Sequence, residues 1–255
     1  MSQVSLVEKY RTKVLEQVDV NGIRWYRFTG ETDPANYLAS VTNILSVAQH
    51  RKLKAWKNGV GEKVQEEVSD TAADFGTYIH NLLEKDLRGE EIAETDLQYE
   101  GKSLVDFLAR WRKLRKDNEI TVDKIELAVY SEMGYAGTLD LIGNFKGKPS
   151  VMDFKSGRYS IKSGWQLAAY KNAYDEMSGL HNGLGMVGLS VQWNKPMNAF
   201  VYQHLDFCWN AFAACFTVWK AMYYNELAKM KWRYLNEPEK AKALVDKVGV
   251  PVQRS

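Results

Sequence analysis

Three short apolar runs in the middle of the chain constrain the fold more than any other feature. They cover residues 120–130, 137–145 and 150–154, and glycine, asparagine, lysine and proline residues separate them. Short apolar runs bounded by turn-forming residues are typical of β-strands. Because short turns connect these runs, we expect three strands that are neighbours in one sheet.

The same kind of pattern predicts the other elements. In chain order we predict a hairpin at 22–28, a short helix capped by Ser40 or Thr42, helices at 53–88 and 97–115, the three central strands, a helix at 166–177, strands at 185–193 and 199–205, and an aromatic helix at 209–234. This order is typical of an α/β or α+β fold in which helices flank a mixed central sheet.

Length and composition indicate an ordinary globular protein. The chain has 255 residues, of which 45% are hydrophobic and 26% charged, so we expect one domain over 1–255. Its core would span about 70–205, with the hairpin and first helices in 1–69 and the aromatic helix in 206–255. A net charge of +2 argues against a histone-like basic protein, but it leaves room for a local basic surface.

The two cysteines, Cys208 and Cys215, bear on both location and cofactor. They are too few for a disulfide framework, which favours a reducing compartment, and too few for a four-cysteine metal cluster contributed by this chain alone. No apolar run approaches the roughly 20 residues needed to cross a membrane. We therefore expect a cytoplasmic protein without a membrane partner.

Two aspartates in the apolar runs point to chemistry. Asp140 stands between Leu139 and Leu141, and Asp153 follows an apolar pair in the next predicted strand. Carboxylates are poor strand formers and costly to bury, so their presence there needs a reason. Carboxylates that converge from neighbouring strands bind a hard cation such as Mg²⁺.

Further residues fit a centre of this kind. Lys155 is two residues after Asp153 and so projects from the same face of the strand, where a lysine can stabilise charge on an attacked phosphate. Glu126, on the preceding strand, is a further candidate metal ligand, and His80, in a predicted helix, could ligate the metal or contact a phosphate. The chemistry would be hydrolysis, because the chain has no glycine-rich Walker loop.

Each of these residues also has an ordinary structural explanation. Asp140 could be an edge-strand residue paired with a lysine, His80 a helix histidine and Glu126 a partly exposed strand residue. Gln166 and Tyr170, four residues apart on a helix, could merely pack. The basic segment 110–116 is either a solvated helix face or part of a DNA path, and the aromatic helix is most simply core, although aromatic rings also stack on unpaired bases.

Taken as an ordered set, these motifs resemble the RecB-like branch of the PD-(D/E)XK nuclease superfamily. The set is Gly76-x-x-x-His80, Glu126, Gly137-x-x-Asp140, Asp153-x-Lys155 and Gln166-x-x-x-Tyr170. The resemblance covers about residues 40–205. Together with the segments 40–45 and 53–56, it is most similar to the mitochondrial genome maintenance exonucleases and their phage relatives.

The resemblance implies a restriction-endonuclease-like core and a DNA exonuclease that uses Mg²⁺ or Mn²⁺. It implies that Asp140 and Asp153 bind the metal with His80 close by, that Lys155 is catalytic, and that Gln166 and Tyr170 support the site. Such an enzyme would act on DNA ends or single strands in replication, recombination or repair, and in a phage it would work in the host cytoplasm with a recombination or replication protein. The alternatives are a DNA-binding module that has lost its chemistry and a structure-specific or restriction-type endonuclease.

Overall fold

The computed structural model describes residues 13–20, 23–33, 36–48, 62–155, 160–179, 186–194, 197 and 199–236. For 62–73 and 224–236 the helical backbone alone is described. Residues 53–61 of the helix predicted at 53–88 lie outside the described residues, as do Gly22 and Gly185 at the ends of a predicted hairpin and strand.

Eight strands form one mixed sheet with the order β1-β2-β3-β7-β8-β9-β10, and β6 pairs with β7. The strands are β1 (Leu15–Val20), β2 (Ile23–Phe28), β3 (Leu38–Ser40), β6 (Thr121–Ser131), β7 (Tyr135–Phe145), β8 (Lys148–Lys155), β9 (Val187–Asn194) and β10 (Ala199–Leu205). The pairs β3–β7 and β8–β9 are parallel, whereas the others are antiparallel. The predicted hairpin, three central strands and two later strands are confirmed, and the mixed sheet holds all of them.

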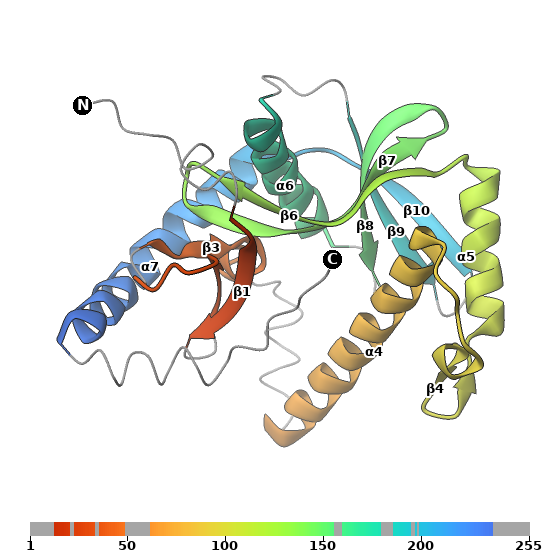
Figure 1. Ribbon diagram of the computed structural model, residues 1–255, viewed down its shortest axis with the longest axis horizontal. Helices are drawn as coiled ribbons and strands as arrows, with labels where there is room; N and C mark the ends of the chain where they lie inside the picture. Colours follow the sequence, from red (N-terminus) through yellow and green to blue (C-terminus); the bar gives the residue numbers. More distant parts are fainter. Residues whose placement is uncertain are drawn as a thin grey trace.

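The central strand β7 has different partners on its two edges. It pairs with β6 from Tyr135 to Asn144 on one edge. On the other edge it pairs with β3 through Tyr135 and Ala136, and with β8 from Leu141 onward. Residues 137–140 therefore lie where β3 and β8 separate, and Figure 1 shows β6 and β7 running from the N-terminal strands towards β8–β10. This gap in the pairing along β7 leaves room for side chains to reach the backbone of the sheet.

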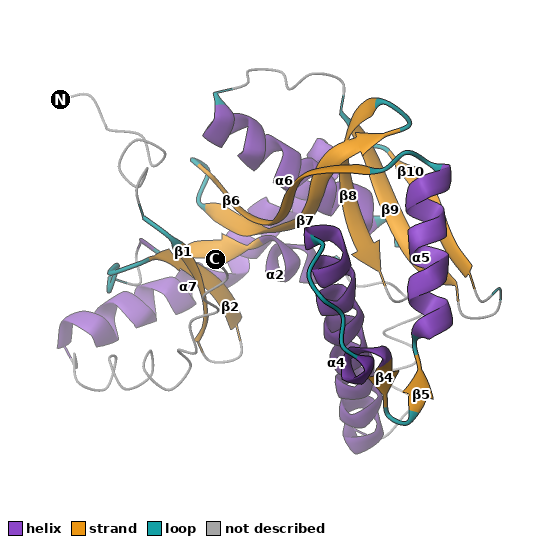
Figure 2. Ribbon diagram, turned by 45° about the vertical axis from the view of Figure 1, so that its right-hand side comes forward, coloured by secondary structure: helices purple, strands orange, loops and turns teal. Residues whose placement is uncertain are grey.

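Helices cover the sheet in two groups. The described helices are α2 (Val41–Ser46), α4 (Glu62–Arg88), α5 (Val105–Asp117), α6 (Lys162–Ser178) and α7 (Trp209–Asn236). One hydrophobic cluster joins α2, α6 and α7 to the N-terminal strands and the start of β7. A second joins α4 and α5 to β7–β10, and Figure 2 shows α4 and α5 in front with α6 and α7 behind. The fold class predicted from the sequence is confirmed.

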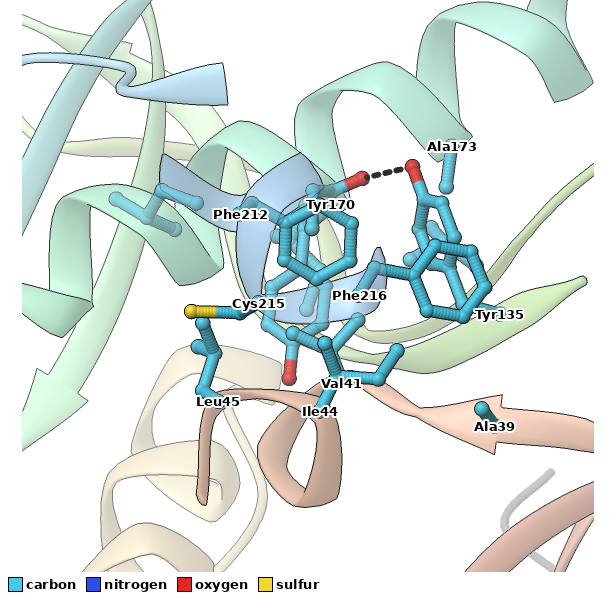
Figure 3. Close-up of a cluster of buried hydrophobic side chains, with 14 of the residues drawn as sticks. Ala39, Val41, Ile44, Leu45, Tyr135, Tyr170, Ala173, Phe212, Cys215 and Phe216 are labelled. Carbon is cyan, nitrogen blue, oxygen red and sulfur yellow. Dashed lines mark hydrogen bonds between the residues drawn. The ribbon is translucent and has the colours of Figure 1, made fainter. Parts of the chain in front are cut away.

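The aromatic face of α7 is core, as its spacing predicted. Phe212 and Phe216 have their ring centroids 4.9 and 5.7 Å from that of Tyr135 at the start of β7. The Tyr135 hydroxyl donates to the Ala169 carbonyl of α6 at 3.1 Å (Figure 3). Trp219 packs edge-on against Trp25 of β2. These contacts fix α6 and α7 against the start of β7, so the strand next to the gap is held rigidly.

The helix predicted at 97–115 is wrong in its first eight residues. The described helix α5 begins at Val105, and it is preceded by the 3₁₀ turn η2 (Glu94–Leu97) and by a two-stranded hairpin of β4 (Gln98–Tyr99) and β5 (Lys102–Ser103). Glu100 and Gly101 both have positive φ, at 48° and 73°. Two successive left-handed residues make a tight hairpin turn, which no helix can contain.

Within the described part of the chain, no helix combines the length and the apolar character that a membrane crossing requires. Cys208 is exposed and Cys215 buried, and neither forms a disulfide.

Candidate metal and catalytic centre

Asp140 lies on β7 at the point where β8 separates from it. The last paired residues of the two strands are Leu141 and Met152, so Asp140 and Asp153 occupy the positions of the next pair. Oδ2 of Asp140 accepts a hydrogen bond of 2.7 Å from the backbone N–H of Phe154. The carboxylate thus takes the place of a missing ladder hydrogen bond, and this contact holds Asp140 at the mouth of the gap.

Asp153, which is buried, and Lys155, which is partly exposed, form an ion pair on β8. The Lys155 Nζ donates to Oδ1 of Asp153 at 2.8 Å, and the Asp153 side chain is 3% exposed. Burial raises the pKa of the Asp153 carboxyl to about 6; Lys155 opposes this rise and the Asp140 carboxylate adds to it. Burial lowers the pKa of Lys155, but the carboxylates of Asp153 and Asp140 outweigh that effect and leave it raised. Lys155 therefore remains a cation beside the two aspartates.

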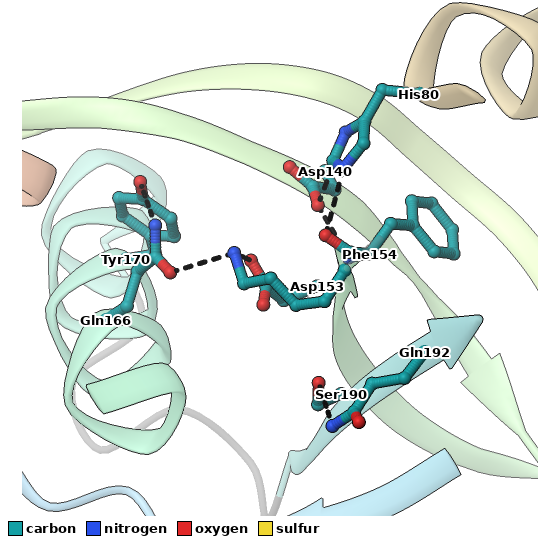
Figure 4. Close-up of polar contacts among 9 residues, drawn as sticks. His80, Asp140, Asp153, Phe154, Gln166, Tyr170, Ser190 and Gln192 are labelled. Atoms are coloured by element: carbon teal, nitrogen blue, oxygen red, sulfur yellow. Dashed lines mark hydrogen bonds and ion pairs between the residues drawn. The ribbon is translucent and has the colours of Figure 1, made fainter. Parts of the chain in front are cut away.

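A chain of hydrogen bonds leads from Lys155 to helix α6. The Lys155 Nζ also donates to Oε1 of Gln166 at 3.2 Å, and Nε2 of Gln166 donates to the Tyr170 hydroxyl at 3.0 Å (Figure 4). A Cβ placed on Gly137 would lie 2.4 Å from the Tyr170 ring, so the ring packs directly on the backbone of β7. The glycine of the Gly137-x-x-Asp140 motif admits Tyr170, and Tyr170 in turn fixes Gln166 and the lysine.

His80 of α4 reaches the same gap. One ring nitrogen, Nε2, lies 2.9 Å from the Phe154 carbonyl oxygen, which can only accept. Nε2 therefore carries the hydrogen, and in the neutral ring the lone pair is on Nδ1. Nδ1 lies 3.9 Å from Oδ2 of Asp140. Contacts of this kind, which fix the tautomer of a histidine, are common around metal ligands.

Glu126 completes a cluster with His80 and Asp140. One ring nitrogen of His80 and one carboxylate oxygen each of Glu126 and Asp140 all lie within 4.8 Å of one another. Glu126 has φ of +50° in the middle of β6, a left-handed conformation that a residue with a side chain rarely adopts in a strand. Strain of this kind costs about 1–3 kcal/mol and concentrates at functional sites.

Two substitutions of Glu126 should distinguish the effect of backbone strain on stability from the effect of losing the carboxylate. Glu126→Gly and Glu126→Ala both remove the charge, but only glycine adopts a positive φ without a steric cost. We expect the glycine variant to be the more stable of the two by about 1 kcal/mol, measured by urea unfolding without added metal. Equal stabilities, or a more stable alanine variant, would show that the backbone at Glu126 is not strained.

The donor atoms suit a divalent cation. His80, Glu126 and Asp140 offer two carboxylates and one imidazole, and Oδ2 of Asp153 is buried without a hydrogen-bond partner. Carboxylate oxygens are the donors preferred by Mg²⁺ and Mn²⁺, and an imidazole nitrogen suits a transition metal better than it suits Mg²⁺. A cation bound beside Asp153 would satisfy its unpartnered oxygen, whose burial is otherwise costly.

The sequence-predicted residues thus fall into two neighbouring groups, linked through the hydrogen bond from the Phe154 N–H to Asp140. His80, Glu126 and Asp140 form the three-residue cluster, whereas Asp153 lies outside that cluster and is held by Lys155. Of the basic helix segment, Arg112 and Arg115 pair with Asp86 of α4, so these two serve the packing of α5 on α4. Sequence reasoning missed two polar residues of β9, Ser190 and Gln192, whose signal was their alternation with Leu189 and Val191 in an apolar run.

Comparison with known proteins identifies the family of this chain. A family model described as the PD-(D/E)XK nuclease superfamily matches residues 49–239. No curated protein matches the chain significantly. The matched segment contains α4, β6–β10 and α6, and so every residue of the centre described above. The chain belongs to the PD-(D/E)XK nuclease superfamily.

Proposed function

We propose that this nuclease is a Mg²⁺- or Mn²⁺-dependent DNA exonuclease that hydrolyses phosphodiester bonds at DNA ends or in single strands. The observation that carries the proposal is the cluster of His80, Glu126 and Asp140 within 4.8 Å, beside the ion pair of buried Asp153 and partly exposed Lys155. The two sets of residues could hold a cation and an attacked phosphate side by side.

In this proposal His80, Glu126, Asp140 and Asp153 hold the metal. A divalent cation supplies Lewis-acid stabilisation of the phosphate and acidifies water. The protein holds the side chains of the proposed ligands in fixed orientations. The Phe154 N–H orients the Asp140 carboxylate, and the Phe154 carbonyl orients the His80 ring. One backbone residue of β8 therefore fixes two of the proposed ligands.

Lys155 is the proposed catalytic residue. Hydrolysis joins a water oxygen to phosphorus, breaks the bond to the leaving sugar oxygen and places a proton on that oxygen. Negative charge grows on the phosphate oxygens during this step, and a fixed ammonium stabilises that charge most in the transition state. Gln166, itself held by Tyr170, keeps the Lys155 ammonium in place.

The test uses end-labelled linear DNA, single- and double-stranded, and a circular single strand of the same sequence. We expect degradation of linear DNA with Mg²⁺ or Mn²⁺, none in EDTA, and an intact circle. Undiminished cleavage in EDTA would overturn the metal centre. Cutting of the circle would make the protein an endonuclease, and binding without cleavage in either metal would make it a DNA-binding module.

His80→Ala should raise the metal concentration needed for cleavage by about tenfold or more, because it removes the nitrogen donor of the cluster. The loss should be greater with Mn²⁺ than with Mg²⁺, since the imidazole favours the transition metal. Cleavage rates are measured across a titration of each metal. His204→Ala is the matched control, because His204 is exposed on β10. If His80→Ala kept full activity at limiting metal, His80 would be a helix residue without a role in the centre.

A further inference from the structure

Strand β9 carries two polar residues in a position where apolar ones are expected. It lies between β8 and β10 inside the sheet, and its Leu189 and Val191 are buried in the cluster under α4 and α5. Ser190 and Gln192, which alternate with them, are 0% and 8% exposed. Burying hydroxyl and amide groups is costly unless they are hydrogen-bonded, so this pair requires an explanation.

The pair lies next to the proposed catalytic residues. In the parallel pairing of β8 and β9, Asp153 is the register partner of Ser190, and Lys155 is the register partner of Gln192. Register partners project from the same face of a sheet, on strands about 4.8 Å apart. Figure 4 shows Ser190 and Gln192 on the strand beside Asp153. Asp153 thus has Asp140 on one side and Ser190 on the other.

Ser190 and Asp153 have complementary groups that the described contacts leave unused. Nε2 of Gln192 donates to the Ser190 hydroxyl oxygen at 3.2 Å, and among the described residues this is the only hydrogen bond that the hydroxyl makes. Its own hydrogen is therefore available. Oδ2 of Asp153 is buried without a partner, while Oδ1 is taken by Lys155. A donor and an acceptor thus remain on neighbouring strands.

We propose that Ser190 is a positioning residue for Asp153: in the metal-bound protein its hydroxyl donates to the Asp153 carboxylate, a contact that Oδ2 does not make in this structure, and Gln192 orients the hydroxyl. The inference rests on the proposed function, in which Asp153 is a metal ligand. Gln192 fits this role because its amide occupies a lone pair of the hydroxyl oxygen and so turns the hydrogen away from itself. Hydrogen bonds to a ligating carboxylate typically account for a ten- to hundredfold difference in metal affinity or activity.

The test is the affinity for Mn²⁺, measured by titration calorimetry on the full chain without DNA. Ser190→Ala should bind Mn²⁺ about ten- to a hundredfold more weakly, and Ser190→Thr, which keeps the hydroxyl, should restore the affinity. Ser150→Ala is the matched control, since Ser150 is equally buried on β8 and its hydroxyl donates to the Lys148 carbonyl instead. Ser150→Ala should bind Mn²⁺ as the unmodified protein does, although both alanine variants should have a lower thermal stability.

Two results would overturn the inference. One is an unchanged Mn²⁺ affinity in Ser190→Ala, and the other is an equal loss in Ser150→Ala, which would indicate a general effect of lost packing. Should Ser190→Ala fail to fold, Gln192→Ala carries the test, with a weaker affinity expected and an unchanged one contradicting the pair's role. Failure of the proposed metal centre gives a different result, because the unmodified protein would then bind no Mn²⁺ at all. Failure of the proposed exonuclease activity alone would appear in the cleavage assays and not in the Mn²⁺ titration.

Discussion

Lys155→Ala is expected to slow DNA cleavage on the order of a hundredfold or more while leaving DNA affinity nearly unchanged. The physical reason is that the ammonium acts on charge that exists mainly in the transition state, so its loss lowers the turnover rate. Affinity for DNA would come from many phosphate contacts, of which Lys155 would supply only one. The variant should therefore separate binding from chemistry.

The measurement pairs two assays on one oligonucleotide: affinity by gel shift in Ca²⁺ and cleavage rate in Mg²⁺. Asp153→Asn should behave in the same way, because it removes the charge of a ligand and keeps its shape. Lys148→Ala is the matched control, since Lys148 is exposed on the same strand. Equal losses of binding and cleavage in Lys155→Ala would make Lys155 a general phosphate anchor, and loss of neither would place the active site elsewhere.

Two substitutions of Asp140 are expected to lower the cleavage rate to a similar extent but to differ in their effect on the stability of the protein. Both Asp140→Asn and Asp140→Ala remove the charge of a proposed ligand, so cleavage should fall on the order of a hundredfold or more in each. The asparagine side chain still offers an oxygen to the Phe154 N–H, whereas alanine leaves that buried donor without its partner. The alanine variant should be less stable than the asparagine variant by about 1–3 kcal/mol.

Cleavage rates and urea unfolding of both variants test this prediction, with Asp123→Asn, an exposed aspartate on β6, as the control. A fully active Asp140→Asn would remove Asp140 from the metal centre. Equal stabilities of the two variants would show that the contact with Phe154 does not hold β7 and β8 together at the gap.

Much of the centre follows from local patterns in the sequence. The apolar runs predict β6, β7 and β8, and the turns between them predict that Glu126, Asp140 and Asp153 lie on neighbouring strands. Alternation places Lys155 on the same face as Asp153. The helical spacing of Gln166 and Tyr170 predicts that they stack. In each case the residues that decide the arrangement are close together in the chain.

The features that sequence reasoning missed depend on distant residues or on backbone geometry. β3 pairs with the same edge of β7 as β8 does, although β3 and β7 are about a hundred residues apart in the chain. No local sequence pattern indicates a pairing over that distance. A positive φ is usually indicated in a sequence by glycine, but at this position the residue is Glu126. The tautomer of His80 depends on the carbonyl of Phe154. The error at 97–104 has a different cause: the apolar spacing there favours a helix, but Glu100 and Gly101 form a turn.

The N-terminal strands have a consequence for solubility. β1–β3 precede the segment that the family model matches, yet β3 covers the edge of β7 at Tyr135 and Ala136. Without these strands, that edge would expose free N–H and C=O groups beside an apolar patch that includes Trp219, now covered by Trp25. An open strand edge of this kind is a template for pairing with another chain. Strands β1–β3 therefore cover this edge of β7 and the Trp219 patch, and a chain shortened to the segment that the family model matches would expose both.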